Sequence, residues 1–242
     1  MCELEAGRET NSISMNQSWH TYLESKGGQI IEGQRTVFPQ FHQEIPDQYL
    51  IPCTQESVIC FDGDDVESFL QSQLTCDIND LSNDEFLFGA YCNPKGRVLA
   101  TFRLFTMNTA IYMLCHHSIV TSLLDRLKMF VMRADVTFRT CPDLAVICFN
   151  THTKNTHFHN LSWAQTGSAW PKECYGDSIP TQCPQLIIAP TSDALMFLSQ
   201  NERNISLLGS DYWDLLQIRH GVASITASTS DLFTPQNLNL DL

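Results

Sequence analysis

The feature that most constrains the fold is an alternation of strand-like and helix-like segments between residues 57 and 138. Val66, Phe69, Leu70 and Leu74 recur at spacings of three and four, which places them on one face of a helix. The same patterns predict a second helix at 119–131, and strands at 57–61, 86–91, 98–105, 110–115 and 133–138. This order is typical of a two-layer α+β module with helices on one face of an antiparallel sheet.

Two turns punctuate this module. Asp64 and Asp65 precede the first helix. We expect them to cap it and expect their negative charges to interact favourably with the positive end of the helix dipole. The segment Asn-Pro-Lys-Gly at 93–96 suits a type I turn, because proline is favoured at the second position and glycine at the fourth. The sequence therefore predicts a β-hairpin with its turn at residues 93–96.

A second, looser module follows from residue 140. It starts with a strand at 143–149, and a polar stretch at 150–184 separates this strand from the next, at 185–189. Helices are expected at 192–198 and at 211–220, the latter closed by Gly221. A stretch as long as 150–184 is typical of a mobile or a functional loop.

Residues 1–46 are mostly polar, and we interpret them as a partly flexible N-terminal extension that lies over a domain, with the folded part starting near Tyr49. Residues 1–14 fit either a tail or an upstream start before Met15. The predicted organisation is this extension, a first α+β module at 47–139 and a second at 140–242.

Charge excludes some function classes. The chain has 27 acidic residues against 14 Lys and Arg, a formal charge of −13. Such a chain repels phosphate groups, so bulk binding of nucleic acid or of anionic membranes is not expected, although a local basic groove stays open. No stretch approaches the ~20 apolar residues of a membrane span. We expect a cytoplasmic protein.

The ten cysteines include no C-x-x-C pair, and several lie inside apolar runs. They fit reduced thiols that act as small hydrophobic side chains, and their spacing predicts no metal site. His152, His157 and His159 could hold a metal but fit a solvated loop better, as Cys174 beside Lys172 fits a loop cysteine better than a nucleophile. Nucleophile-elbow, Walker A, dinucleotide and zinc-protease motifs are absent from the sequence.

Four blocks in order, at 61–77, 91–105, 127–136 and 233–240, together resemble the YgfZ family. Their sequences are FDGDDVESFLQSQLTCD, YCNPKGRVLATFRLF, LKMFVMRADV and FTPQNLNL. These folate-binding proteins are associated with tRNA modification and are related to the glycine-cleavage T-protein, an aminomethyltransferase of one-carbon metabolism. The resemblance runs from about Val58 to the last residue and is weakest at 140–205.

The resemblance implies two ferredoxin-like modules around a channel that binds tetrahydrofolate or a derivative, followed in the family by a β-barrel. Trp213 matches the family's folate-contacting tryptophan, but it also fits a core position of an amphipathic helix. Asp77 is a candidate acceptor for the donor-rich pterin edge, or else a helix-terminal turn residue. Lys95, Arg97 and Arg133 are candidate cations for the ligand's glutamate tail or for an RNA phosphate.

Some positions depart from the family. Ala100 and Thr101 stand where the aminomethyltransferases carry paired aspartates, which argues against classical methylene transfer. Arg219-His220-Gly221 replaces a Glu-x-Gly, and Glu56 replaces a second tryptophan. The chain ends at Leu242, before the family's Lys-Gly-Cys-Tyr-x-Gly-Gln-Glu motif, so we expect the C-terminal barrel to be absent through truncation.

The resemblance implies a folate-binding accessory protein that supports tRNA modification and maintenance of iron–sulfur enzymes, which would be its protein partners. With the departures above, we expect it not to be a classical methyl transferase. One alternative is a divergent folate-dependent aminomethyltransferase. The other is a degenerate module that binds no ligand and acts only through protein interactions.

Overall fold

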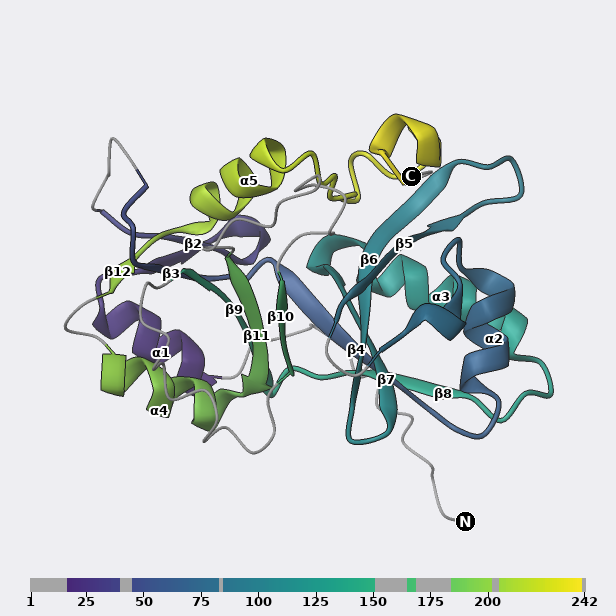
Figure 1. The fold of residues 1–242 in the computed structure, drawn as a ribbon, viewed down its shortest axis with the longest axis horizontal. Coiled ribbons are helices and arrows are strands. Elements are labelled where there is room, and N and C mark those ends of the chain that lie inside the picture. Colours follow the sequence, from purple (N-terminus) through teal and green to yellow (C-terminus); the bar gives the residue numbers. More distant parts are fainter. Residues whose placement is uncertain are drawn as a thin grey trace, which may run out of the picture.

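The computed structural model describes residues 17–39, 45–82, 85–150, 165–168, 184–201 and 205–240. Two five-stranded sheets stand side by side, and each carries helices on its outer face (Figure 1). We name them the first and the second sheet. The predicted α+β class is confirmed.

The first sheet has the strand order β5-β6-β7-β4-β8 and is antiparallel throughout. Its strands are β4 (Glu56–Asp62), β5 (Leu87–Cys92), β6 (Val98–Met107), β7 (Ala110–His116) and β8 (Thr137–Thr140). Helices α2 (Val66–Gln73) and α3 (Val120–Val131) cover one face through a core that includes Phe69, Leu70, Leu123 and Leu127. These elements agree with the predicted alternation except near residues 132–136.

The predicted strand at 133–138 starts later, at Thr137. Met132 has a positive φ of 46°, which turns the chain sharply after α3. The backbone N–H of Asp135 then donates to the Asp65 carboxylate at 2.8 Å. The prediction that Asp65 caps α2 through its side chain is therefore wrong, because that carboxylate bonds Asp135 and makes no cap bond.

The second sheet has the order β10-β11-β9-β3-β12. Its strands are β3 (Tyr49–Pro52), β9 (Leu144–Asn150), β10 (Gln165–Ser168), β11 (Gln185–Pro190) and β12 (Ser206–Leu207). Strand β3 precedes the whole first sheet in the sequence but pairs with β9 here. The two sheets therefore do not follow one another along the chain as simply as modules at 47–139 and 140–242 would.

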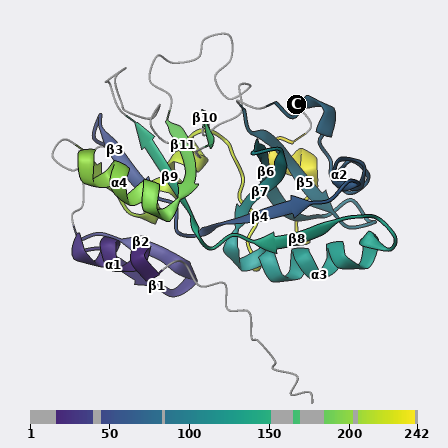
Figure 2. The ribbon, with the colours of Figure 1, turned by 90° about the horizontal axis from the view of Figure 1, so that it is seen from below.

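The folded part begins before Tyr49. Helix α1 (Gln17–Ser25) and the short hairpin of β1 (Gln29–Ile31) and β2 (Arg35–Val37), joined by the 3₁₀ turn η1 (Glu32–Gln34), lie beside the second sheet (Figure 2). Trp19 and Leu23 of α1 are buried with residues of α4 (Thr191–Asn201) against this sheet. Two apolar residues one helical turn apart suffice to anchor α1, and that signal is too short to stand out in the sequence.

The inner faces of the two sheets share one core, which we call the junction core. It gathers Ile51 and Val146 from the second sheet, Val58 and Phe105 from the first, and Trp213 from helix α5 (Ser210–Arg219). Beyond α5, Gly221 has a positive φ of 66°, as the predicted helix end requires.

The final segment returns to the first sheet (Figure 1). Val98 N–H donates to the Phe233 carbonyl at 2.8 Å, and Asp231 N–H donates to the Val98 carbonyl at 2.9 Å. The 3₁₀ turn η6 (Pro235–Leu238) ends this segment. The two hydrogen bonds at Val98 place the family-like block at 233–240 beside the family-like hairpin at 91–105. Elsewhere in the first sheet's surroundings, further 3₁₀ turns are η2 (Ile78–Asp80) and η3 (His117–Ile119).

Candidate functional site at the sheet junction

The junction core holds a buried polar cluster around Trp213. Trp213 lies on α5 with none of its surface exposed, and its indole Nε1 donates a 2.9 Å hydrogen bond to Oε1 of Glu56. Glu56 begins β4 and is 8% exposed. A carboxylate rarely stays buried unless it is paired, so this position is a candidate for function.

Arg103 supplies the positive charge of the same cluster. It lies on β6 and is buried, with its Cζ atom 5.2 Å from the Trp213 ring centroid and 5.0 Å from that of Phe88. Burial lowers the pKa of Arg103, and the negative charge of Glu56 opposes that shift. The guanidinium remains protonated at neutral pH and gains cation–π contact with both rings.

Two thiols border this cluster, those of Cys53 and Cys148. Burial raises the pKa of both, so they stay protonated and act as small apolar side chains. The seven described cysteines are free thiols, as the sequence suggests for a reduced chain. In the described part of the chain, no group of three or more His, Cys, Asp or Glu side chains could hold a metal ion.

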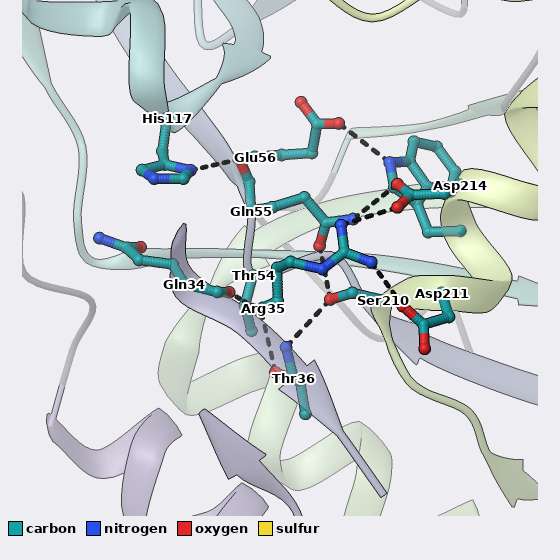
Figure 3. A network of polar contacts seen from close by, with 11 residues as sticks. Gln34, Arg35, Thr36, Thr54, Gln55, Glu56, His117, Ser210, Asp211 and Asp214 are labelled. Atoms are coloured by element: carbon teal, nitrogen blue, oxygen red, sulfur yellow. Dashed lines mark hydrogen bonds and ion pairs between the residues drawn. The ribbon is translucent and has the colours of Figure 1, made fainter. Parts of the chain in front are cut away.

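A hydrogen-bond network fixes the backbone next to Glu56 (Figure 3). Gln55 accepts at its side-chain oxygen a 2.8 Å bond from the Ser210 hydroxyl, and Ser210 Oγ in turn accepts from Thr36 N–H at 3.0 Å. His117 N–H donates to the Gln55 carbonyl at 2.9 Å. Gln55, Ser210 and Thr36 are all buried.

Arg35 continues this network to the surface. Its guanidinium bonds Asp211 at 2.6 Å and Asp214 at 2.7 Å, so it joins β2 to α5 (Figure 3). Glu56 and Trp213 are therefore positioned by contacts among three segments that are far apart in sequence, namely β2, the β3–β4 connection and α5.

A shallow pocket opens beside Glu56, between the two sheets. It encloses about 40 Å³, room for a few water molecules and too little for a two-ring pterin. Its lining comes from strand β4, the end of β8 and the start of β9, from the β3–β4 and β8–β9 connections, and from α1, η1 and the start of α4. A ligand of folate size would need the junction to open further.

The structure does not bring the four predicted site residues together. Trp213 is in the junction core, whereas Asp77, Lys95 and Arg133 are exposed at three other places on the first-sheet side of the molecule. Asp77 caps η2, and the backbone and side-chain N–H groups of Asn79 that bond it lower its pKa. The ligand contacts of Trp213, Asp77, Lys95 and Arg133 stay predictions.

Lys95 lies at the tip of the β5–β6 hairpin, where its N–H donates to the Asn93 side chain at 2.8 Å. Arg97, close to this tip, donates to the Leu232 carbonyl at 3.1 Å. Arg133 follows α3 and is exposed.

The positions that depart from the family also have structural roles. Ala100 is fully buried, and Thr101 Oγ1 accepts a 2.9 Å bond from Ile225 N–H. Arg219 is exposed, and His220 Nδ1 lies 2.8 Å from the Leu216 carbonyl at the end of α5. The histidines at 152, 157 and 159, predicted to lie in a solvated loop, and Cys174 with Lys172 lie outside the described residues.

The sequence predictions do not include Arg103, and they include Glu56 only as a departure from the family pattern. Both carry a signal that could have marked them. Arg103 is the only charged residue inside the apolar run 98–105, and Glu56 lies two residues before the apolar run 58–61. A charged residue within a buried strand needs a partner, and here the two charges support one another.

Relatives that share one name match most of the chain. The tRNA-modifying protein YgfZ of Colwellia psychrerythraea is 27% identical over 201 residues, which is 81% of this chain and 62% of the relative. That of Photobacterium profundum is 28% identical over 206 residues, 81% of this chain and 60% of the relative. The chain thus spans about three-fifths of the length of these relatives. No family model matches the sequence.

The fold is similar to that of a solved enzyme, the glycine cleavage system aminomethyltransferase T from Bartonella henselae. The TM-score is 0.70 over 93% of this chain and 67% of that chain, with 10% sequence identity. This likeness concerns the fold alone. No described helix is long and apolar enough to cross a membrane.

Proposed function

We propose that this chain is a member of the YgfZ family that binds a reduced folate at the sheet junction and supports tRNA modification without catalysing methylene transfer, a proposal that its similarity to proteins of that name supports. The observation that carries the proposal is the Glu56–Trp213 hydrogen bond inside a core shared by two sheets. Small-molecule sites are mostly apolar with a few fixed polar groups, and the junction provides both once it opens further.

The chemistry of a pterin matches these groups. A pterin is flat and has a donor-rich edge, so an aromatic face and a carboxylate acceptor recognise it together. Trp213 provides the face and Glu56 the carboxylate. Glu56 thus takes the role of edge acceptor that the sequence assigned to Asp77, and its replacement of a family tryptophan becomes a gain of recognition.

The ligand's outer part would reach the surface. We keep Lys95 and Arg133 as candidate cations for the glutamate tail or for a partner, and Asp77 as a polar contact outside the junction. Their separation from Trp213 favours contacts with a partner protein such as an iron–sulfur tRNA-modifying enzyme.

Absence of turnover rests on the missing acids. Methylene transfer passes through a cationic, iminium-like species, and a nearby carboxylate stabilises such a charge. Ala100 is buried in the core beneath α2 and α3, and the Thr101 hydroxyl is engaged by Ile225. Neither position supplies the negative charge, so we propose an accessory role. We also propose that the chain acts in the cytoplasm.

Tryptophan fluorescence tests ligand binding directly. Titration of the chain with 5-formyltetrahydrofolate should give a saturable change, and most of that change should vanish in Trp213→Phe. Trp19→Phe should keep most of the change, because Trp19 packs with α1 and α4, although it also lines the small pocket beside Glu56. Absence of a saturable signal at high micromolar ligand would leave only the interaction-module alternative.

A cellular experiment tests the second half of the proposal. Deletion of the gene should lower particular modified nucleosides in total tRNA, measured by mass spectrometry, and the wild-type chain should restore them. Glu56→Gln should restore them less well. Full restoration by a variant that binds no folate would separate the tRNA role from the ligand.

A further inference from the structure

Arg103 covers the aromatic face that a flat ligand would need. Its guanidinium carbon lies 5.2 Å from the Trp213 ring centroid and 5.0 Å from the Phe88 ring centroid. Both distances are within the range of a stacked cation–π contact. The Trp213 ring itself is fully buried, so a ligand can stack on this face only after Arg103 has moved.

The guanidinium also has the chemistry of the ligand edge. It is planar and presents N–H donors, and the negative charge of Glu56 stabilises it. The 2-amino-4-oxo edge of a pterin is an acylguanidine, which is likewise planar and presents N–H donors. The Trp213 ring therefore already stacks on a group of the kind that this edge would replace, and the Glu56 carboxylate, hydrogen-bonded to the same indole, acts on that group through its charge.

We propose that Arg103 is an internal occupant of the junction site, and that the site is specific for 2-amino-4-oxo heterocycles, which displace the Arg103 guanidinium on binding. The inference rests on the proposed function and deepens it. Pterins and guanine share this edge, and the probes below distinguish them.

Displacement makes Arg103 a determinant of affinity. The apparent affinity of a site equals its intrinsic affinity multiplied by the fraction of molecules in which the site is vacant. A buried guanidinium that stacks on two rings and is stabilised by the charge of Glu56 keeps that fraction small. Removing the guanidinium should therefore strengthen binding, the opposite of what a residue that clamps the ligand would show.

Equilibrium dialysis with tail-free probes tests this proposal. Pterin and guanosine carry the 2-amino-4-oxo edge, whereas lumazine has a carbonyl in place of the amino group and is the matched control ligand. The proteins are the wild-type chain, Arg103→Ala, Arg103→Lys and, as a control on the same sheet, the exposed Arg139→Ala. Arg103→Lys keeps a charge near Glu56 but lacks the planar group, so it serves if Arg103→Ala does not fold.

We expect Arg103→Ala or Arg103→Lys to bind pterin at least tenfold more tightly than the wild-type chain, with lumazine and Arg139→Ala unchanged. An equal gain for guanosine would extend the ligand class to guanine. Unchanged or weaker pterin binding by both Arg103 variants would overturn the proposal, as would an equal gain for lumazine. If the wild-type chain still binds 5-formyltetrahydrofolate in that case, the proposed function stands and only the role of Arg103 fails.

Discussion

The indole Nε1 of Trp213 and the carboxylate of Glu56 are joined by a 2.9 Å hydrogen bond across 157 residues of sequence. This bond connects helix α5 to the first residue of strand β4 in the first sheet. Glu56 also opposes the desolvation of Arg103, so one carboxylate serves both a hydrogen bond and a charge in the junction core.

Glu56→Gln should lower the free energy of unfolding by about 2 kcal/mol, because it removes the carboxylate charge that opposes the desolvation of the Arg103 guanidinium. Urea unfolding followed by circular dichroism measures the change. Glu67→Gln, on the exposed face of α2, is the control and should change stability by less than about 0.5 kcal/mol. Equal stabilities of the two variants would show that Glu56 and Arg103 do not support one another.

Arg35→Ala should loosen the N-terminal hairpin without affecting the first sheet. The two carboxylate contacts of Arg35 are partly exposed, with side-chain exposures of 29% for Arg35 and 42% for Asp214, so the global loss should be about 1 kcal/mol. Hydrogen exchange should quicken at residues 29–37 and at the start of α5. Lys128→Ala, which removes an exposed pair with Asp125, should show neither effect; faster exchange in β5–β7 would contradict the assignment of Arg35 to a local contact.

Gly63→Ala should be far more damaging than Gly96→Ala. Gly63 has a φ of 130°, and a Cβ there would lie 2.1 Å from the Asp135 carbonyl oxygen. Gly96 has a φ of 73° with nothing within 4 Å of a Cβ, so its substitution costs only the backbone strain of about 1–2 kcal/mol. Thermal unfolding of both variants gives the comparison, and similar melting temperatures would refute the close approach of 63 to 135.

His116 should make stability fall in acid. Burial lowers the pKa of His116 below its usual 6.5, and the Glu56 charge only partly opposes the shift. Because the unfolded chain then binds the proton more readily, this contribution is present above about pH 6.5 and is lost as the pH falls through the native pKa. His116→Asn should reduce the slope of stability between pH 7.5 and 5.5, measured by urea unfolding at several pH values; an unchanged slope would assign the acid sensitivity to other groups.

The sequence predicts local elements well where the apolar period is long. Helix α3 and the β5–β6 hairpin follow from patterns within about 15 residues, and the structure has them nearly where expected. Asp65 shows the limit, because its side chain bonds Asp135, 70 residues away, instead of capping α2. A local capping rule cannot anticipate that competition.

Long-range pairing and the site itself were less predictable. Strand β3 pairs with β9, about a hundred residues later, although it directly precedes β4 of the other sheet. The family resemblance marked Trp213, but its partners come from β4 and β6, and no periodicity joins these three elements. A lone charge inside an apolar run at Arg103, and another just before such a run at Glu56, are the one local signal that points to the junction.

The central claim is that Glu56 and Trp213 form the floor of a reduced-folate site. Equilibrium dialysis of 5-formyltetrahydrofolate against the wild-type chain and Glu56→Gln tests it most directly, with circular dichroism confirming that both are folded. We predict saturable one-to-one binding by the wild-type chain and at least tenfold weaker binding by Glu56→Gln. No saturable binding at millimolar ligand, or equal affinity of the two proteins, would contradict the account.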